Sequence, residues 1–396
     1  MINTSPYGWI SQYFFSFFFV YGAYLPFWAI WLQSEGISST DSGIILGLAF
    51  GTRCISNLFL TPRIQRVEQY IPALRWCSVL CAVLIALHGL TAGDFVWIAV
   101  ATIFLNLFLG PIIPVSDALA NYYTTLNMLD YGRTRLWGSV AFIVGSSIVG
   151  WVVTHYGESW ILYCALIGMV VTILLSLRLP APPPVTQQQP EDGSRVSLTG
   201  ILKEWPVIKF LFLIACIQGS HAAYYSFSSV YWKSVGYSES VVGYLWSLGV
   251  IAEICVFAFS KRFFKSWSVH AMFLLSAVAV IVRWGLMAMT HQIAVLVVIQ
   301  LFHSLTFAVA HLAAIRYIQQ SGSADRMIAL QALYNAIPLG AVIAVMTTIS
   351  GWGYERWGSY VFFGMAVMGV IALFVRVDYQ ERTTTEIAPE AQNSSG

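Results

Sequence analysis

The sequence predicts an all-α membrane protein built from two six-helix bundles. Hydrophobic residues make up 58% of the chain and charged residues 10%, and the mean hydropathy of +0.72 lies outside the usual range of soluble domains. Several apolar runs reach the length of about 20 residues that crosses the hydrocarbon of a bilayer. A polar, proline-rich stretch divides these runs into two groups, and the groups repeat one another in sequence.

We expect twelve membrane spans. They cover about residues 7–32, 42–62, 71–91, 95–121, 134–155, 159–178, 206–232, 239–260, 268–289, 292–316, 327–352 and 358–376. With a cytoplasmic N-terminus, most basic residues fall at cytoplasmic helix ends, as Arg63 and Lys261 do, and only Lys233 and Arg356 face outward. Both termini are therefore predicted to be cytoplasmic.

Residues 180–204 separate the two groups of spans. Four prolines open this stretch and polar residues follow, so it cannot bury enough apolar surface to fold. It predicts a cytoplasmic linker between an N-terminal bundle, residues 1–179, and a C-terminal bundle, residues 205–377. Residues 378–396 are polar, with no aromatic residue after Tyr379, and predict a disordered cytoplasmic tail.

The two groups of spans repeat in parallel. A shift of 200 positions pairs Ala23, Tyr24, Gly36 and Gly43 with Ala223, Tyr224, Gly236 and Gly243, and a shift of 201 pairs Gly157 with Gly358. Parallel six-span repeats are typical of the major facilitator architecture, where the substrate site lies near the midplane between the halves. In this register Arg53 and Glu253 occupy equivalent positions.

Of 20 basic and 18 acidic residues, only Arg53, Asp117, Glu253 and Arg283 fall deep inside the predicted spans. A charge near the bilayer centre costs at least about 2.5–3.5 kcal/mol, so such residues usually face a cavity or a partner. We therefore expect a transport site at these residues.

Asp117 lies on a span that Pro111 and Pro114 should bend, because each proline removes a backbone donor. Arg135 follows on the next span, and the hairpin between them can bring the two charges together. An ion pair that only fixes packing is the alternative to a functional pair.

A polar stripe marks the first span of the second half. Gln218, His221, Tyr224 and Tyr225 have helical spacing and share one face. The alternative is an aromatic packing face, but a glutamine and a histidine in an apolar span need hydrogen-bond partners, which favours a pore-lining face.

Three further spans supply Glu253, Arg283, His303 and His311, and the two histidines lie about two turns apart on one face. No carboxylate or cysteine joins them at a metal-ligand spacing, so we expect neither metal nor cofactor. The sequence also carries no phosphate-binding loop, nucleophile elbow or zinc signature. We therefore expect no enzyme activity, and a transport process that draws on an ion gradient or on the substrate's own gradient.

Several stretches carry a family resemblance: residues 21–28 (YGAYLPFW), 116–121 (SDALAN), 135–142 (RLWGSVAF), 221–225 (HAAYY), 243–249 (GYLWSLG) and 283–285 (RWG). With them the chain resembles the 3-phenylpropionic acid transporters of Gram-negative bacteria, major facilitator proteins related to the lactose permease type of proton symporter. The resemblance runs over essentially the whole chain. It implies uptake of 3-phenylpropionate, or of cinnamate, with a proton across the inner membrane.

The lactose permease pattern matches in part. Asp117 and Arg135 keep the spacing of the acid and arginine that bind galactoside in that family, and Phe142 falls where a tryptophan stacks on the sugar. Arg283 and His303 match its coupling residues.

Two positions depart from that pattern. Thr306 stands where a carboxylate is expected three residues after the histidine, and Glu253 lies about one turn from the usual glutamate. These differences do not support sugar specificity or an identical proton path.

The residues themselves favour an aromatic acid. An aromatic lining suits a phenyl ring, and an arginine supplies the fork for a carboxylate. Arg135 is the first candidate for that role, with Arg53 and Arg283 as alternatives. Glu253 is the first candidate for the proton and Asp117 the second, with histidines as relays. The aromatic candidates are Trp28, Trp137, Phe142, Tyr224, Tyr225 and Trp246.

Two other classes of protein stay open. A sugar or nucleoside proton symporter would use the same acidic and amide groups with fewer apolar walls, and a non-transporting membrane receptor would need a sizeable soluble domain that the sequence lacks. The expected partners are a small aromatic acid, a proton and the lipid bilayer of a bacterial inner membrane. We expect a monomer and no nucleic-acid partner.

Overall fold

The computed structural model describes residues 3–185 and 198–377. The tail predicted at 378–396 and residues 186–197 of the predicted linker lie outside these residues. The first half of the chain contains β1 Asn3–Thr4, α1 Pro6–Ser34, α2 Ser39–Phe59, η1 Thr61–Arg63, η2 Val67–Gln69, α3 Tyr70–His88, α4 Phe95–Leu109, α5 Ile112–Thr125, α6 Tyr131–Tyr156, α7 Ser159–Ser176 and β2 Leu179–Pro180. The second half contains α8 Leu198–Ile201, α9 Trp205–Gly219, α10 Ala222–Ser234, α11 Glu239–Phe263, α12 Val269–Met289, α13 Ile293–Leu301, η3 Ser304–Val309, α14 Ala310–Gln319, α15 Ala324–Ala336, η4 Ile337–Val342, α16 Ile343–Trp357, η5 Gly358–Tyr360 and α17 Val361–Leu373.

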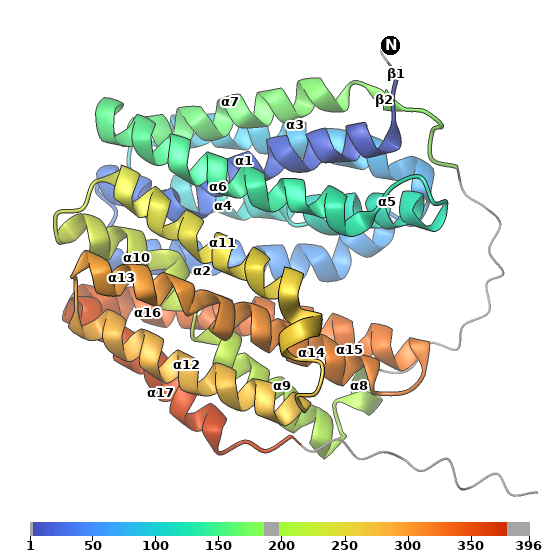
Figure 1. Ribbon diagram of the computed structural model, residues 1–396. Helices are drawn as coiled ribbons and strands as arrows, with labels where there is room; N and C mark the ends of the chain where they lie inside the picture. Colours follow the sequence, from blue (N-terminus) through green and yellow to red (C-terminus); the bar gives the residue numbers. More distant parts are fainter. Residues whose placement is uncertain (1–2, 186–197, 378–396) are drawn as a thin grey trace, which may run out of the picture.

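The helices run side by side in Figure 1, with α1 and α3 to α7 in the upper part, α9 and α12 to α17 in the lower part, and α2, α10 and α11 between them. Eleven helical segments of the described chain are long and apolar enough to span a membrane. The last of them, Asp325–Leu373, has 49 residues, which is room for two crossings of about 20 residues each. The all-α fold is confirmed, and the count of twelve spans stays a prediction.

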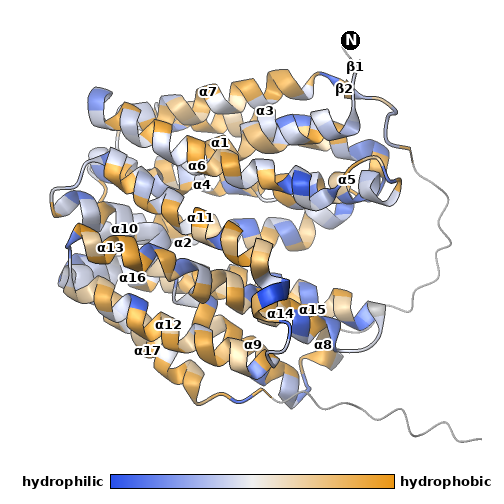
Figure 2. Ribbon diagram, in the orientation of Figure 1, coloured by the Kyte–Doolittle hydropathy of each residue, from blue (hydrophilic) through white to orange (hydrophobic). Residues whose placement is uncertain are grey.

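The outer surface of the bundle is apolar. Figure 2 shows hydrophobic residues along much of α7, α12 and α17, and large side chains such as Ile167, Val278 and Val367 are exposed there. A soluble protein rarely exposes so much contiguous apolar surface. The chain is therefore a multi-pass membrane protein.

The sequence repeat reappears in the turns. Gly36 and Gly236 follow α1 and α10 with φ of 83° and 96°, and Gly157 and Gly358 follow α6 and α16 with φ of 94° and 55°. Glycine adopts these left-handed angles at little cost, whereas other residues rarely do. A glycine with positive φ thus ends the corresponding helices in both halves.

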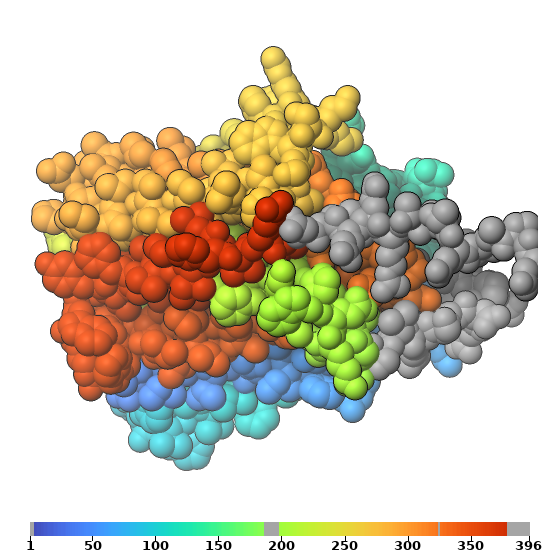
Figure 3. Space-filling model, turned by 90° about the horizontal axis from the view of Figure 1, so that it is seen from below, coloured from blue at the N-terminus to red at the C-terminus, as the bar shows by residue number. Residues whose placement is uncertain are grey.

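Two helix pairs join the halves at one end of the molecule. The helix α2 packs on α16, and the helix α6 packs on α11; in Figure 3 the blue of α2 borders the orange-red of α16. A Cβ added to Gly43 would lie 2.6 Å from Cα of Gly351, and one added to Gly243 would lie 2.1 Å from the carbonyl oxygen of Ser146. Only glycine permits such close helix contact at these positions.

Several membrane-spanning helices are interrupted. The helix is interrupted at Gly110–Pro111 between α4 and α5, as expected for Pro111, whereas Pro114 lies inside α5 without an interruption. The segments η3 and η4 are π-helical. Such interruptions are frequent at functional sites, and η3 begins directly after His303.

The two ends of the predicted linker are ordered. The strands β1 and β2 pair in parallel, with Asn3 opposite Leu179, and Ile201 of α8 is buried. The proline-rich composition therefore does not keep the whole of residues 180–204 free of structure.

Candidate functional site

A buried line of polar groups crosses the C-terminal half. Arg283 of α12 donates Nη1–H to Nδ1 of His303 at 2.8 Å, and Nε2 of His303 lies 2.6 Å from Oε1 of Glu253 on α11. The side chain of Arg283 is fully buried, and those of His303 and Glu253 are 7% and 16% exposed. Three of the residues expected from the sequence thus form one cluster.

This geometry assigns the protons on His303. The guanidinium has only donors, so Nδ1 of His303 must accept from Arg283. The ring proton therefore sits on Nε2 and is donated to the Glu253 carboxylate. A neutral imidazole links the positive and negative groups.

Thr306 extends the line to His221. Its hydroxyl oxygen accepts from Nη1 of Arg283 at 2.9 Å and lies 3.0 Å from Nε2 of His221. Nδ1 of His221 faces the backbone carbonyls of Ile217 and Gln218 at 3.2 Å, so Nε2 of His221 accepts the hydroxyl proton of Thr306.

Aromatic rings cover one side of this cluster. Tyr224 stacks on Trp246 with ring centroids 4.6 Å apart, and Tyr225 lies 6.2 Å from Trp246. The guanidinium of Arg283 lies over the Tyr224 ring at 4.6 Å. The Tyr224 hydroxyl donates to Oε1 of Gln300 at 2.8 Å.

The N-terminal half holds an arginine bound by neutral groups. Arg53 of α2 donates to the Tyr21 hydroxyl at 2.7 Å and to Oδ1 of Asn106 at 2.8 Å. The Asn106 amide in turn donates to the Tyr24 hydroxyl at 3.1 Å. Arg53 and Glu253 occupy equivalent helices, and each bonds within its own half.

The predicted pairing of Asp117 with Arg135 is present. Nε of Arg135 lies 3.5 Å from Oδ1 of Asp117, and their side chains are 30% and 26% exposed. The Arg135 guanidinium lies 4.3 Å from the centroid of Phe18. Burial of Arg135 is thus far less complete than that of Arg283.

Aromatic residues of the two halves meet near this region. Phe142 of α6 lies 6.4 Å from Tyr21 and 6.3 Å from Trp246 of α11, measured between ring centroids. A narrow cavity also opens between the halves. Its lining comes from α1, α2 and α10: Tyr24, Leu25, Trp28, Ala29, Leu46, Ala49, Phe50, Arg53, Tyr225 and Ser226.

Three candidates lie apart from this cluster. Trp137 is 41% exposed and donates its indole N–H to the Tyr7 hydroxyl. His311 contacts the Tyr334 hydroxyl through Nδ1. Gln218 is buried, donates to the Phe307 carbonyl at 3.5 Å and neighbours the Tyr334 hydroxyl.

Sequence reasoning missed Tyr21 and Asn106 as partners of Arg53. Asn106 is fully buried and is the only amide in the apolar run of α4, from Phe95 to Leu109. A buried amide needs a hydrogen-bond partner, and this signal was available in the sequence.

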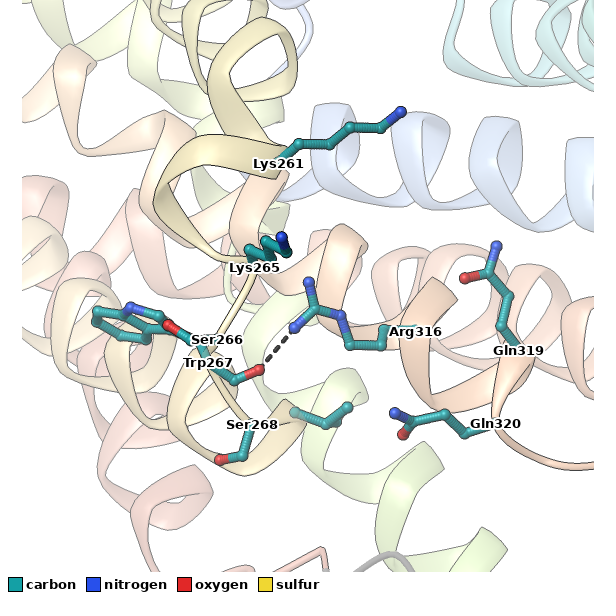
Figure 4. A pocket seen from close by; sticks show the side chains of 9 residues that line it. Lys261, Lys265, Ser266, Trp267, Ser268, Arg316, Gln319 and Gln320 are labelled. Atoms are coloured by element: carbon teal, nitrogen blue, oxygen red, sulfur yellow. Dashed lines mark hydrogen bonds between the residues drawn. The ribbon is translucent and has the colours of Figure 1, made fainter.

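Figure 4 shows a second pocket, at the surface of the C-terminal half. Arg316 donates Nη1–H to the carbonyl of Trp267 at 2.6 Å. The pocket opens at the ends of helices of a single half, so it does not meet the expectation of a site between halves. It is lined by Lys261, Lys265, Ser266, Trp267, Ser268, Val269, Arg316, Gln319 and Gln320.

Known proteins resemble the chain over nearly its whole length. It matches the MFS_1 like family over residues 7–365. It is 40% identical to a probable 3-phenylpropionic acid transporter of Escherichia coli (strain K12), over 93% of this chain and 96% of that protein. It is 24% identical to a maltose permease of Geobacillus stearothermophilus, over 94% and 95% of the two chains.

Solved structures share the fold. The nucleoside transporter NupG, in a mutant form, superposes with a TM-score of 0.79 at 15% identity, over 93% of this chain and 98% of that one. A bacterial homologue of the lysosomal transporter Spinster, in an inward-facing conformation, gives a TM-score of 0.67 at 12% identity, over 93% and 95%.

Proposed function

Because the chain belongs to the MFS_1 like family and is a membrane transporter rather than an enzyme, we propose that it takes up 3-phenylpropionate, or a closely related aromatic carboxylate, together with a proton. The name of the 40% identical relative supports this substrate class. The observation that carries the proposal is the buried Glu253–His303–Arg283 line packed against the aromatic wall of Tyr224 and Trp246.

The aromatic wall suits the ring of the substrate. Phe142 contributes from the N-terminal half, and Trp246 and Tyr225 contribute from the C-terminal half. A phenyl group between these rings gains apolar burial and edge or face contacts. Because both halves contribute, relative motion of the halves opens and closes the site toward each side in turn.

Charge balance explains why a proton accompanies the acid. Glu253 and Arg283 offset one another across neutral His303. A carboxylate that joins them leaves one negative charge in excess, and an uncompensated buried charge costs several kcal/mol. A proton taken up with the substrate removes that charge. We propose Glu253 as the acceptor and Asp117 as the second candidate.

We propose that the protein lies in the bacterial inner membrane as a monomer, with both termini in the cytoplasm. The basic residues Lys261, Lys265 and Arg316 then face the cytoplasm, as the positive-inside rule favours. The end where α2 packs on α16 then faces the periplasm.

The test is uptake of labelled 3-phenylpropionate into membrane vesicles with and without an imposed pH gradient. We expect accumulation only with the interior alkaline. Unlabelled cinnamate should compete, whereas maltose and nucleosides should not. Competition by a sugar or a nucleoside, with no uptake of the aromatic acid, would replace this proposal by the sugar or nucleoside symporter.

A further inference from the structure

Arg283 keeps one edge of its guanidinium without a partner. Of its five N–H groups, the two on Nη1 bind His303 and Thr306. Nε and Nη2 are buried and make no hydrogen bond within the described structure. The Tyr224 hydroxyl lies beside the guanidinium and donates its proton to Gln300. Its oxygen can accept a hydrogen bond from Arg283, but it is neutral and does not offset the charge of the cation.

Unsatisfied donors on a buried cation are costly. Burying a donor without a partner costs about 1–3 kcal/mol of folding free energy, and more when the group is charged. Nε–H and one N–H of Nη2 point in the same direction, and this edge matches the two oxygens of a carboxylate. An anion bound at this edge accepts from both donors.

A second unpaired donor lies beside the same tyrosine. Gln300 is fully buried, and its Oε1 accepts the Tyr224 hydroxyl proton. Its Nε2 has no partner within the described structure. Gln300 thus contacts the hydroxyl of Tyr224, and Arg283 contacts the face of its ring.

The other arginines are engaged differently. Arg53 donates from Nη1 to Tyr21 and from Nη2 to Asn106, so of its three nitrogens only Nε lacks a partner. Arg135 has an acidic neighbour, Asp117, and its side chain is 30% exposed. Only Arg283 of the three presents a free two-donor edge that is shielded from water.

We propose that Arg283 binds the substrate carboxylate through Nε and Nη2, with Gln300 Nε2 as an additional donor. This inference rests on the proposed function and names the anchoring residue for its substrate. The ring then lies toward Trp246, which stacks on Tyr224. Arg283 takes the role for which the sequence favoured Arg135.

The test compares an acid with its amide. We would measure binding of 3-phenylpropionate and of 3-phenylpropanamide to the purified full chain, since the two ligands share ring and spacer and differ in charge. Arg283→Lys keeps the charge and removes the fork. We expect it to weaken binding of the acid by about 10- to 100-fold, as expected for hydrogen bonds to a charged group, and to weaken the amide much less.

Gln300→Glu provides a second test. It keeps an oxygen that accepts from Tyr224 but replaces the free amide donor with an acidic oxygen. We expect the same selective loss of acid binding. Gln292→Glu, at the exposed start of α13, adds the same charge elsewhere and should leave both affinities unchanged. Size-exclusion elution reports whether each variant folds.

The outcomes separate the two proposals. If the unaltered protein binds no aromatic carboxylate, the proposed function fails and this inference fails with it. If it binds the acid, and Arg283→Lys still prefers acid over amide while Arg135→Lys loses that preference, the function stands and Arg283 is not the anchor. If Arg283→Lys does not fold, an unchanged preference in Gln300→Glu overturns the inference.

Discussion

His303 donates its Nε2–H to Glu253 across 2.6 Å because its Nδ1 is already held by Arg283. The His303 ring thus lies between the Glu253 carboxylate on α11 and the Arg283 guanidinium on α12 and hydrogen-bonds to both. A change of protonation at Glu253 therefore changes the hydrogen bonding of Arg283 without direct contact between the two. In the proton-coupled uptake that we propose, this link couples the proton on Glu253 to the anion bound in the same half.

We predict that Glu253→Gln abolishes accumulation of substrate against a gradient but retains exchange. Glutamine keeps the size of the side chain and accepts the His303 proton, but it cannot bind or release a proton. Steps that require deprotonation should stop, while exchange of internal for external substrate continues. Vesicle uptake and counterflow measure the two activities separately.

Two results would argue against this role. Full accumulation by Glu253→Gln would transfer proton coupling to Asp117 or to the histidines. Loss of both accumulation and exchange in a folded variant would place Glu253 in substrate binding or in the scaffold.

We predict that Thr306→Val destabilises the protein by about 1 kcal/mol or more. The change keeps the shape but removes the hydroxyl that joins Arg283 to His221, so both lose a partner. Hydrogen bonds between membrane helices are worth about 0.6 kcal/mol on average and up to about 1.7. Thermal unfolding in detergent measures the effect.

Thr172→Val is the matched control for Thr306→Val. Thr172 is equally buried, but its hydroxyl bonds only to the carbonyl of Gly168 in its own helix. We expect a smaller loss of stability there. Equal losses in the two variants would mean that Thr306 links no network.

The sequence predicts the helices well because their signals are local. Apolar run length and the prolines place most spans within a few residues of the observed helices, including the break at Pro111. The hairpin geometry also brings Asp117 to Arg135, as expected, since one short turn joins their helices.

The contacts inside the site depend on how the helices pack together, which the sequence of a single helix does not determine. The periodicity of α6 cannot tell that Trp137 is exposed and bonds to Tyr7, since the choice of neighbour is made by the fold. Nor does an α-helical period anticipate the π-helix after His303. There Phe307 stacks between His303 and His311, with ring centroids 5.6 and 6.3 Å away.

We predict that Gly351→Ala opens the end where α2 meets α16. A Cβ at Gly351 would lie 2.6 Å from both Cα of Gly43 and the carbonyl oxygen of Ser39, and neither backbone atom can turn aside. Spin labels at Ser159 and Tyr360, one in each half, should move apart in a cysteine-free background. Transport should slow because this end closes less often.

Gly364→Ala serves as the control for Gly351→Ala. An added Cβ at Gly364 in α17 meets nothing within 4 Å, so label distances and transport should stay unchanged. An unchanged distance in Gly351→Ala itself would show that the glycine contact does not hold the halves together.

We predict that the ion cluster at the same end strengthens closure in a pH-dependent way. Lys233 of the C-terminal half pairs with Glu158 of the N-terminal half and lies 2.8 Å from Glu239. The hydrogen bond from Lys233 holds the pKa of Glu158 below its ordinary value. A carboxylate with a lowered pKa stabilises the paired state at and above its ordinary pKa, and this stabilisation is lost as the pH falls through the lowered value.

The fraction of molecules closed at this end should therefore stay constant from neutral pH down to about pH 5. It should fall only below that pH, since an unpaired glutamate has a pKa of about 4.3. Lys233→Met should shift the equilibrium away from the closed state at neutral pH by at most about 1 kcal/mol, because both side chains of the ion pair are more than a third exposed. The same spin-label distance, followed across pH, measures both effects. If Lys233→Met keeps the closed population and its pH dependence, the contacts of α2 with α16 close this end without help from the ion cluster.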